Sequence, residues 1–587
     1  MTRLFNDPAA FADEMIDGFV AANRNHVRRV TGGVVRSTRS EAGTVAVVIG
    51  GGSGHYPAFG GIVGQGLAHG AAMGNLFASP SAAQVHSVAV AAGNGGGVLL
   101  SYGNYAGDVL HFTQAQERLI SEGVDCRSVA VTDDVASASV AEKAKRRGIA
   151  GDLTVFKAAA AAAEAGYSMD DVERVAILAN ERTRSFGVAF SGCTLPGADA
   201  PLFSVPEGRM AVGMGIHGEP GIRETEVPTA DELAELFVST LLAELPDGIT
   251  EAAGQRVGVI LNGLGSVKYE ELFVVYRRVA ALLEQAGLEI VDPEVGELVT
   301  SFDMAGASLT LFWLDEELEG FWRAPADTPA YRKGSVDAAD QLDESEMHDQ
   351  SDETVAVVAG SPESQMSAIV VQAALDALVA VVDENADELG RIDAVAGDGD
   401  HGIGMQRGSH AAKAAAREAL QSGAGVQTLL ERAGDAWADR AGGTSGALWG
   451  VALRAIGQAL GDNDKPTVTS VAAGAQAATD GIKNFGAQVG DKTMVDALVP
   501  FSDTLVAEAA AGASITDAWS KAADAASAAA TATADLLPKM GRARPHAEKS
   551  LGTPDAGAYS FGLIVQAIAA VLAAQPAAFA AEEGENA

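Results

Sequence analysis

Two patterns of hydrophobic and polar positions divide the chain. Up to about residue 333, short β-branched runs such as "TVAVVIGGG" and "QRVGVILNGLG" alternate with helical stretches such as "YEELFVVYRRVAALLEQAG". This alternation is typical of α/β domains with covered sheets. From about Ser361 onward, apolar residues recur at three- and four-residue spacing, as in "MSAIVVQAALDALVAVV". The sequence therefore predicts an α/β domain over residues 1–333 and an all-helical domain over residues 357–578.

A polar segment separates the two patterns. The run "VDAADQLDESEMHDQSDET" is dense in Asp, Glu, Ser and Gln and has almost nothing to bury. Such composition predicts an acidic, flexible linker over residues 334–356, and residues 579–587 form a polar tail. At 587 residues the chain is long enough for two or more cores.

Charge and cysteine content narrow the function classes. Lys plus Arg number 40 against 78 Asp plus Glu, a net charge of -38, which argues against binding to nucleic acid or anionic membranes. The two cysteines and the N-terminal "MTRLFNDPAAFADEM" show neither a disulfide framework nor a signal peptide. The apolar run "LIVQAIAAVLAAQPAAFAA" is interrupted by Gln566 and Pro576, which favours a bundle helix over a membrane span. We expect a cytoplasmic protein that holds any anionic substrate through a metal ion or backbone amides.

Glycine-rich turns in the first part place polar residues where a ligand could reach them. "GGGSGH" follows a strand-like run, and its glycines would let backbone N–H groups approach a phosphate or a hydroxylated molecule; close packing is the alternative. It does not follow the dinucleotide-binding fingerprint. Asp108 in "NYAGD" is a helix cap or a base. His217 in "GMGIHGEPG" is a candidate base, metal ligand or nucleophile.

Carboxylates gather in the second part. "RIDAVAGDGDHG" carries Asp393, Asp398 and Asp400, which would repel one another unless a divalent cation neutralised them; a capped turn is the alternative. Oxygen ligands of this kind favour Mg²⁺, although the spacing is not that of an EF-hand. "GGTSG" precedes a helical run whose N-terminus could receive phosphate, and it is not a Walker motif. Together the two segments indicate a Mg·nucleotide site.

The same residues resemble a known family along nearly the whole chain. "GGGSGH", "NYAGD", "GMGIHGEPG", "NGLG" and "TSFDMAGASLTL" are similar to the ketose-binding domain of the single-chain, ATP-dependent dihydroxyacetone kinases. "GDGDHG", "GGTSG", "GDKTMVDAL" and "GTPDAG" resemble their nucleotide-binding domain. The resemblance implies an α/β ketose-binding domain of two subdomains, then an all-α eight-helix barrel that holds Mg·ATP at one end. It also implies a homodimer formed through the first domain.

The resemblance also implies roles for individual residues. His217 would hold the ketose covalently as a hemiaminal, and His55 and Asp108 would polarise the terminal hydroxyl. The substrate would lie against Gly52, Ser53, Gly54 and Gly103. Magnesium would be bound by Asp393, Asp398 and Asp400. The nucleotide would be contacted by His401, Gly402, Gly404, Thr444, Ser445, Met494, Arg542, Asp555 and Gly557.

Three departures from the family pattern bear on the substrate. Tyr56 and Phe59 stand where dihydroxyacetone-specific members have Glu and a second His, and Gly103 stands where Lys is frequent. "RARPHAEKS" also lacks the usual form of its segment. Replacing Lys by Gly would open space, and aromatic rings would change how the hydroxyls are paired. We therefore expect a ketose larger than dihydroxyacetone, with four-carbon erythrulose as the candidate.

Other functions stay open at this point. These motifs also occur in non-catalytic regulators that bind a ketose. They occur in ketose domains that work with a phosphorylated protein instead of ATP. They occur as well in kinases with a side activity that forms a cyclic nucleotide from a flavin dinucleotide. A fatty-acid kinase subunit shares the aspartate motif only, and "GIHGEPG" argues against it. The sequence leaves open whether the nucleotide domain serves its own chain or a dimer partner.

Overall fold

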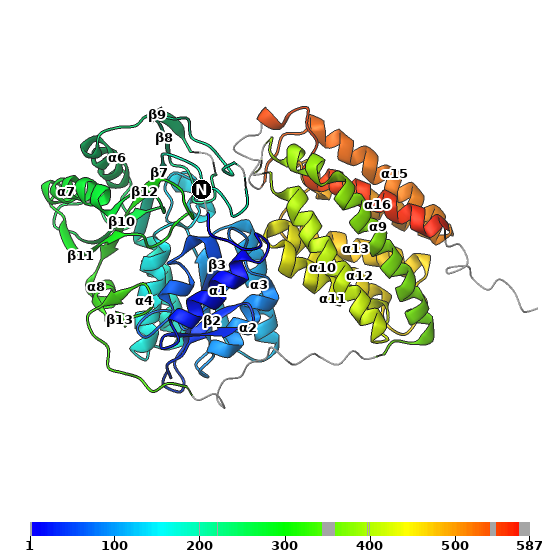
Figure 1. Cartoon of the computed structure of the whole chain (residues 1–587), viewed down its shortest axis with the longest axis horizontal. Helices are drawn as coiled ribbons and strands as arrows, with labels where there is room; N and C mark the ends of the chain where they lie inside the picture. Colours follow the sequence, from blue (N-terminus) through cyan, green and yellow to red (C-terminus); the bar gives the residue numbers. More distant parts are fainter. Residues whose placement is uncertain are drawn as a thin grey trace, which may run out of the picture. The chain divides into compact units, whose positions relative to one another are not determined.

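The computed structural model describes residues 3–198, 200–219, 221–342, 359–395, 397, 399–540 and 548–574. Internal contacts divide the chain into two compact units, Met1–Asp352 and Glu353–Ala587, each of which is described by itself (Figure 1). Within the predicted linker, residues 340–342 pair through their backbones with Ser37, Thr38 and Arg39, and residues 343–358 lie outside the described part.

The first unit contains two six-stranded sheets. The first has the order β1-β2-β4-β3-β5-β6, in which β4, β3, β5 and β6 are parallel. Its strands are β1 (Val27–Val30), β2 (Gly33–Arg36), β3 (Ala46–Gly52), β4 (Gly70–Gly74), β5 (Val98–Gly103) and β6 (Cys126–Val131). The helices associated with it are α1 (Phe11–Ala22), α2 (Ala82–Ala92), α3 (Ala106–Ser121), α4 (Asp152–Glu164) and α5 (Met169–Glu181). Because the chain leaves β3 to one side and later returns to its other side, the carboxyl end of β3 is a topological switch point, where ligands bind in such sheets.

The second sheet has the order β11-β10-β12-β7-β8-β9 and is mostly antiparallel. Its strands are β7 (Thr183–Ala189), β8 (Arg209–Val212), β9 (Arg223–Glu226), β10 (Arg256–Gly263), β11 (Glu289–Gly296) and β12 (Gly306–Leu314). Helices α6 (Ala230–Leu242) and α7 (Tyr269–Gln285) share a core with one face of this sheet. Helix α8 (Glu316–Arg323) and the short pair β13 (Ala326–Asp327) and β14 (Arg332–Lys333) follow.

Helix α4 joins the two sheets into one unit. Its residues from Asp152 to Ala163 are buried on every side, which is the pattern of a helix enclosed by protein. The same apolar cluster contains β3, the α4 alanines and Phe312 of β12. The alanine run "KAAAAAAE" therefore allows two sheets to approach a single helix closely.

The second unit is a closed ring of helices. Each helix packs against the next, and the last packs against the first. The helices are α9 (Pro362–Asp393), α10 (His401–Gln421), α11 (Val426–Ala441), α12 (Gly443–Leu460), α13 (Val468–Lys483), α14 (Val495–Ala510), α15 (Ile515–Ala532) and α16 (Ala556–Ala574). Small residues permit this packing: a Cβ at Gly450 would lie 3.0 Å from the Cβ of Ala438.

Two of these helices, α9 and α16, are long and apolar enough to cross a membrane by length and composition alone. They pack against each other, and Leu375, Leu378, Ile564 and Val565 lie in the core of the ring. Their apolar character is thus accounted for by the ring.

Candidate functional site

The parallel strands β3 and β5 bring two sequence motifs together. Ile49 and Ser101 are register partners in these neighbouring strands, so both strands end at the same edge of the sheet. The turn Ser53–His55 follows β3, and the first turn of α3, which contains Asp108, follows β5. Asp108 is buried in that turn, whose N-cap is Tyr105.

His217 reaches this edge from the second sheet, on the loop between β8 and β9. Its Nε2 lies 2.9 Å from Nε2 of His55, and its Nδ1 lies 3.2 Å from Oε1 of Glu219. On the far side, Nδ1 of His55 lies 2.7 Å from the carbonyl oxygen of Thr300. The two histidines therefore belong to one chain of hydrogen bonds that runs from Glu219 to Thr300.

The loop that carries His217 needs its glycines. The Glu219 carboxylate accepts a hydrogen bond of 3.0 Å from the His217 backbone N–H, and a Cβ on Gly215 would lie 2.1 Å from the same carboxylate oxygen. Gly218 has φ +81°, and a Cβ there would meet the Phe203 ring at 2.1 Å. Side chains at either position would displace His217 or Glu219.

Aromatic rings surround the histidine pair. The ring centroids of Tyr105 and Phe77 lie 4.5 and 5.8 Å from that of His217, and Phe59 packs edge-on to His55. Burial, helped by the neighbouring His217, lowers the pKa of His55 to about 3. His55 is therefore neutral in the free protein at physiological pH. Tyr56, by contrast, is 42% exposed.

The glycine-rich turn after β3 packs against backbone. A Cβ on Gly52 or on Gly54 would lie 2.5 or 2.7 Å from the carbonyl oxygen of Leu76. Between them, the Ser53 hydroxyl is buried and has no hydrogen-bond partner in the described part of the chain. A buried hydroxyl of this kind is suited to a substrate hydroxyl.

Gly103 ends β5 and lies beside Tyr105 and Asp152. A Cβ at Gly103 would lie 3.1 Å from the Tyr105 ring and 3.4 Å from the Asp152 carboxylate. A longer side chain at position 103 would therefore meet the Tyr105 ring, which folds back over the end of β5 and also lies next to His217.

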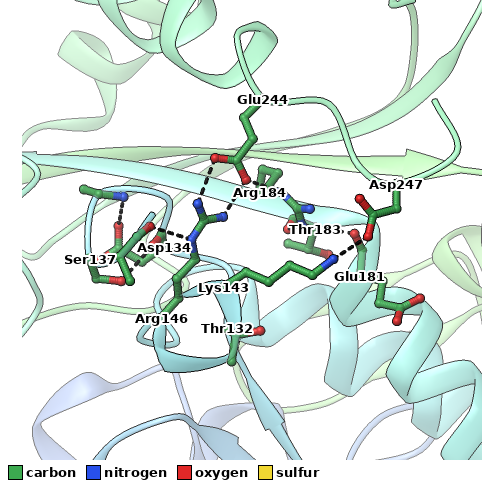
Figure 2. Close-up of polar contacts among 12 residues, drawn as sticks. Thr132, Asp134, Ser137, Lys143, Arg146, Glu181, Thr183, Arg184, Glu244 and Asp247 are labelled. Carbon is green, nitrogen blue, oxygen red and sulfur yellow. Dashed lines mark hydrogen bonds and ion pairs between the residues drawn. The ribbon is translucent and has the colours of Figure 1, made fainter. Parts of the chain in front are cut away.

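A polar cluster behind the site connects to Glu219. Arg147 donates hydrogen bonds of 3.1 and 2.9 Å to the buried Asp134 carboxylate, and its guanidinium lies 3.6 Å from Glu219. Figure 2 shows the adjoining ion pairs, in which Arg146 and Arg184 converge on Glu244. The sequence reasoning did not assign Glu219, Thr300 or Arg147. Only the position of Glu219, two residues after His217, offered a signal.

In the second unit, most of the predicted residues that the structure describes lie at or near the connections at one end of the ring. Short connections make neighbouring helices antiparallel, so the connections α9–α10, α11–α12, α13–α14 and α15–α16 share an end. Asp393 ends α9, and His401, Gly443 and Ala556 begin α10, α12 and α16. Met494 is the N-cap of α14. Four helix N-termini at one end supply N–H groups and positive partial charge.

Carboxylates at this end interact unfavourably with one another. Burial by the surrounding chain and the neighbouring Asp393 raise the pKa of Asp400 to about 6. The pKa of Asp555 is raised to about 7, chiefly by burial and then by Asp496 and Asp393. No group of three metal-binding side chains occurs among the described residues, but Asp398 lies outside them. The donor set of hard oxygens fits a divalent cation, which would relieve this repulsion.

The remaining residues predicted to contact the nucleotide differ in their surroundings. Nε2 of His401 lies 3.0 Å from the Ser560 hydroxyl, and a Cβ at Gly557 would lie 3.4 Å from that of Met494. Thr444 is exposed in the first turn of α12, and the Ser445 hydroxyl contacts the Met405 sulfur. Gly402 differs, because a Cβ there would lie 2.0 Å from the Ala386 carbonyl oxygen, so it serves helix packing. Gly404 has no atom within 4 Å of such a Cβ, and Arg542 lies outside the described residues.

Comparisons with known proteins agree with this two-unit arrangement. The Dak1 domain family matches residues 17–330, and the DAK2 domain family matches residues 395–570. The chain is 64% identical to the L-erythrulose kinase of Pectobacterium atrosepticum, over 97% of both chains. It is 55% identical to the D-erythrulose kinase of Mycolicibacterium smegmatis, over 97% of this chain and 98% of the relative.

A solved structure covers both units. The dihydroxyacetone kinase from C. freundii, in complex with AMP-PNP and Mg²⁺, is 29% identical, with a TM-score of 0.51, and the match spans 97% of this chain and 99% of that one. The predicted fold class is confirmed: an α/β region with two sheets followed by an all-helical region of about eight helices. The chain belongs to the single-chain dihydroxyacetone kinase family, in which a Dak1 domain is followed by a DAK2 domain.

Proposed function

We propose that the chain is an ATP- and Mg²⁺-dependent kinase that phosphorylates the terminal hydroxyl of a short-chain ketose, erythrulose in preference to dihydroxyacetone, held as a hemiaminal on His217. The observation that carries the proposal is the chain of hydrogen bonds through Glu219, His217 and His55, set among aromatic rings. The two erythrulose kinase relatives support the choice of ketose.

The hydrogen bonds determine where protons lie before substrate binds. A carbonyl oxygen only accepts, so His55 must donate its Nδ1–H to Thr300, which leaves its Nε2 as an acceptor. His217 must then donate its Nε2–H to His55. Since the Glu219 carboxylate also accepts, His217 donates from both ring nitrogens, one to Glu219 and one to His55.

This arrangement provides a balanced route to the hemiaminal. The Nε2 proton of His217 moves to Nε2 of His55, which leaves a lone pair on His217. That lone pair forms a bond to the ketose carbonyl carbon, the π electrons move to oxygen, and His55 returns its proton to that oxygen. The positive charge stays on the alkylated ring, whose Nδ1–H still faces Glu219. A protonated His55 is a strong acid because its site disfavours charge.

The chain's own groups would then align the phosphoryl transfer. Asp108 would accept a hydrogen bond from the terminal hydroxyl, and the Ser53 hydroxyl would pair with another. Alignment matters more than proton removal in such transfers. Asp393, Asp398 and Asp400 would hold Mg²⁺, which would supply neutralisation of the nucleotide phosphate charge. His401, Thr444, Ser445, Met494, Arg542, Asp555 and Gly557 would contact the nucleotide.

The test is coupled ADP release from Mg·ATP with D-erythrulose, L-erythrulose, dihydroxyacetone, glyceraldehyde and glycerol. We expect the highest kcat/KM with an erythrulose enantiomer and no turnover with glycerol, which has no carbonyl. Turnover should fall in His217→Ala and vanish in Asp398→Ala. A preference for dihydroxyacetone would overturn the proposed substrate. Ketose binding without ADP release would favour the non-catalytic regulator.

We also infer a cytoplasmic homodimer formed through the first unit. Phe273 and Val274 support this, because these apolar side chains of α7 are 55% and 51% exposed. Light scattering on the wild type and on Phe273→Asp tests the assignment. A monomeric wild type would contradict it.

A further inference from the structure

One arginine lies between two buried carboxylates behind the histidine pair. Nε and Nη2 of Arg147 donate hydrogen bonds of 3.1 and 2.9 Å to Oδ2 of Asp134, and Nη1 lies 3.6 Å from Oε2 of Glu219. The side chains of Asp134, Arg147 and Glu219 are only 3%, 14% and 13% exposed. Glu219 pairs with His217 in the proposed function, whereas Arg147 has no role there.

Local contacts hold Asp134 and Arg147 in one arrangement. The Asp134 backbone N–H donates to the Arg147 carbonyl oxygen at 3.1 Å, and Oδ1 of Asp134 accepts a hydrogen bond of 3.0 Å from the Ala136 N–H. The Arg147 backbone N–H donates to the Ser137 hydroxyl, which donates to the Asp134 carbonyl oxygen; Figure 2 labels Asp134 and Ser137 in this turn. Because both Nε and Nη2 bind Asp134, the guanidinium plane is fixed and Nη1 faces Glu219.

The same pair connects the two sheets of the first unit. Asp134 follows β6 of the first sheet and forms a β-bridge with β7 of the second sheet. Glu219 and His217 lie on the β8–β9 loop of the second sheet, whereas His55 follows β3 of the first. The contact between Arg147 and Glu219 therefore ties the loop that carries His217 to the sheet that carries His55.

The contact between Arg147 and Glu219 is electrostatic. The 3.6 Å between Nη1 and Oε2 is longer than a hydrogen bond, and Oε2 accepts a hydrogen bond of 3.0 Å from the His217 backbone N–H. Burial favours the neutral form of Arg147, but Asp134 and then Glu219 act in the opposite direction and raise the pKa of Arg147 above its ordinary value. Without this guanidinium, the buried carboxylates of Asp134 and Glu219 would repel each other, and one would take up a proton or turn away.

The carboxylate opposite His217 has to be ionised and correctly turned, because it faces the ring that carries positive charge in the hemiaminal. We propose that Arg147 is a positioning residue for this reaction: held by Asp134, its charge keeps Glu219 ionised and directed at His217. This inference rests on the proposed function, since it gives Arg147 a part in the covalent step at His217. Arg147 acts through Glu219 and not on the ketose itself.

A double-mutant cycle between Arg147 and Glu219 tests the proposal, with kcat/KM for erythrulose measured on the full-length protein. Arg147→Met should lower kcat/KM about tenfold in the wild type, but less than about twofold in Glu219→Gln, where no charge is left to position. Arg147→Lys keeps the charge and loses the fork, so its loss should be about threefold, and this loss should also disappear in Glu219→Gln. The control is Arg174→Met, which removes an exposed ion pair with Glu317 and should leave kcat/KM unchanged in both backgrounds.

Equal fold-changes for the Arg147 substitutions in the wild type and in Glu219→Gln would overturn the proposal, because the arginine would then act independently of Glu219. The Arg147→Lys cycle decides the matter if Arg147→Met does not fold, which thermal unfolding and AMP-PNP binding reveal. The same cycle can be measured as erythrulose affinity by calorimetry without nucleotide, and the same fold-changes are expected. Erythrulose binding without ADP release would contradict the kinase activity, while the calorimetric cycle would still decide the part of Arg147, so the two failures are distinguishable.

Discussion

The two candidate sites of this protein are built from opposite chemistries. In the first unit, neutral His55 and its partner His217 are enclosed by aromatic rings, and burial lowers the pKa of His55. In the second, carboxylates share the end of a helical ring, and burial raises the pKa of Asp400 and Asp555. The same physical effect, loss of water, disfavours charge in both places.

The two sites differ in which groups of opposite charge lie next to their ionisable side chains. The histidine site has an internal partner, because Glu219 pairs with His217. Among the described residues, Arg407 acts on Asp400 and Lys492 acts on Asp555, yet the pKa of each carboxyl remains raised. The Lys492 amine is held by the carbonyls of Leu536 and Ser550. In the proposed function, the first site moves a proton and the second binds a cation.

The largest expected effect comes from removing one group from each site. Asp400→Asn should lower kcat by about a thousandfold, since several kcal/mol of charge stabilisation would be lost, while ketose binding persists. His217→Ala should remove covalent ketose binding while AMP-PNP binding persists. Steady-state kinetics and calorimetry with each ligand check this separation. Asp480→Asn, a substitution at an exposed position, serves as the control. If either variant lost binding of both the ketose and AMP-PNP, the two sites would not be separate.

The next effect concerns Glu219. Glu219→Gln keeps the shape but removes the charge opposite His217, so kcat/KM for erythrulose should fall about a hundredfold. Steady-state kinetics with erythrulose measure this change. An unchanged kcat/KM would argue against the role of the carboxylate opposite His217, and Glu224→Gln on the exposed part of β9 is the matched control.

A smaller effect concerns stability and pH. The pKa of His55 is about 3 in the folded protein against 6.5 for the free group, so the unfolded chain binds the extra proton first. The contribution of His55 is therefore fully present above pH 6.5 and is lost as pH falls toward 3, by about 2 kcal/mol at pH 5. His55→Gln should reduce this pH dependence in hydrogen exchange of β3 peptides. The substitution His410→Gln, at an exposed position, should leave this pH dependence unchanged. If protection from hydrogen exchange varied equally with pH in the wild type and in His55→Gln, the burial argument would be contradicted.

The smallest effect is expected at Ser53. Because its hydroxyl has no partner in the described structure, Ser53→Ala should leave stability almost unchanged and raise KM for the ketose about fivefold. Ser101→Ala provides the contrast, since that buried hydroxyl donates to the Val129 carbonyl and its loss should cost about 1 kcal/mol. Thermal unfolding and kinetics separate the two. A marked loss of stability in Ser53→Ala would indicate a structural role instead.

Periodicity and glycine placement were enough to predict the α/β and helical regions and the turn after β3. These depend on short-range sequence, because strand and helix periods and turn chemistry act over a few residues. The space predicted at Gly103 stays a prediction, and the sequence did not indicate that the Tyr105 ring, from two positions later, lies beside it. Glu219 and Arg147 were missed because their importance depends on contacts, not on local pattern.

The sequence by itself determined which segments form strands, helices and flexible turns, and which of them carry imidazoles or carboxylates. Only the tertiary structure decided that Thr300, His55, His217 and Glu219 form one chain of hydrogen bonds, since they come from turns that lie up to 245 residues apart along the chain. The physical reason is that sheet pairing and the burial of α4 bring these turns together. Protonation then follows from that enclosure, because a histidine's charge depends on the water and partners around it.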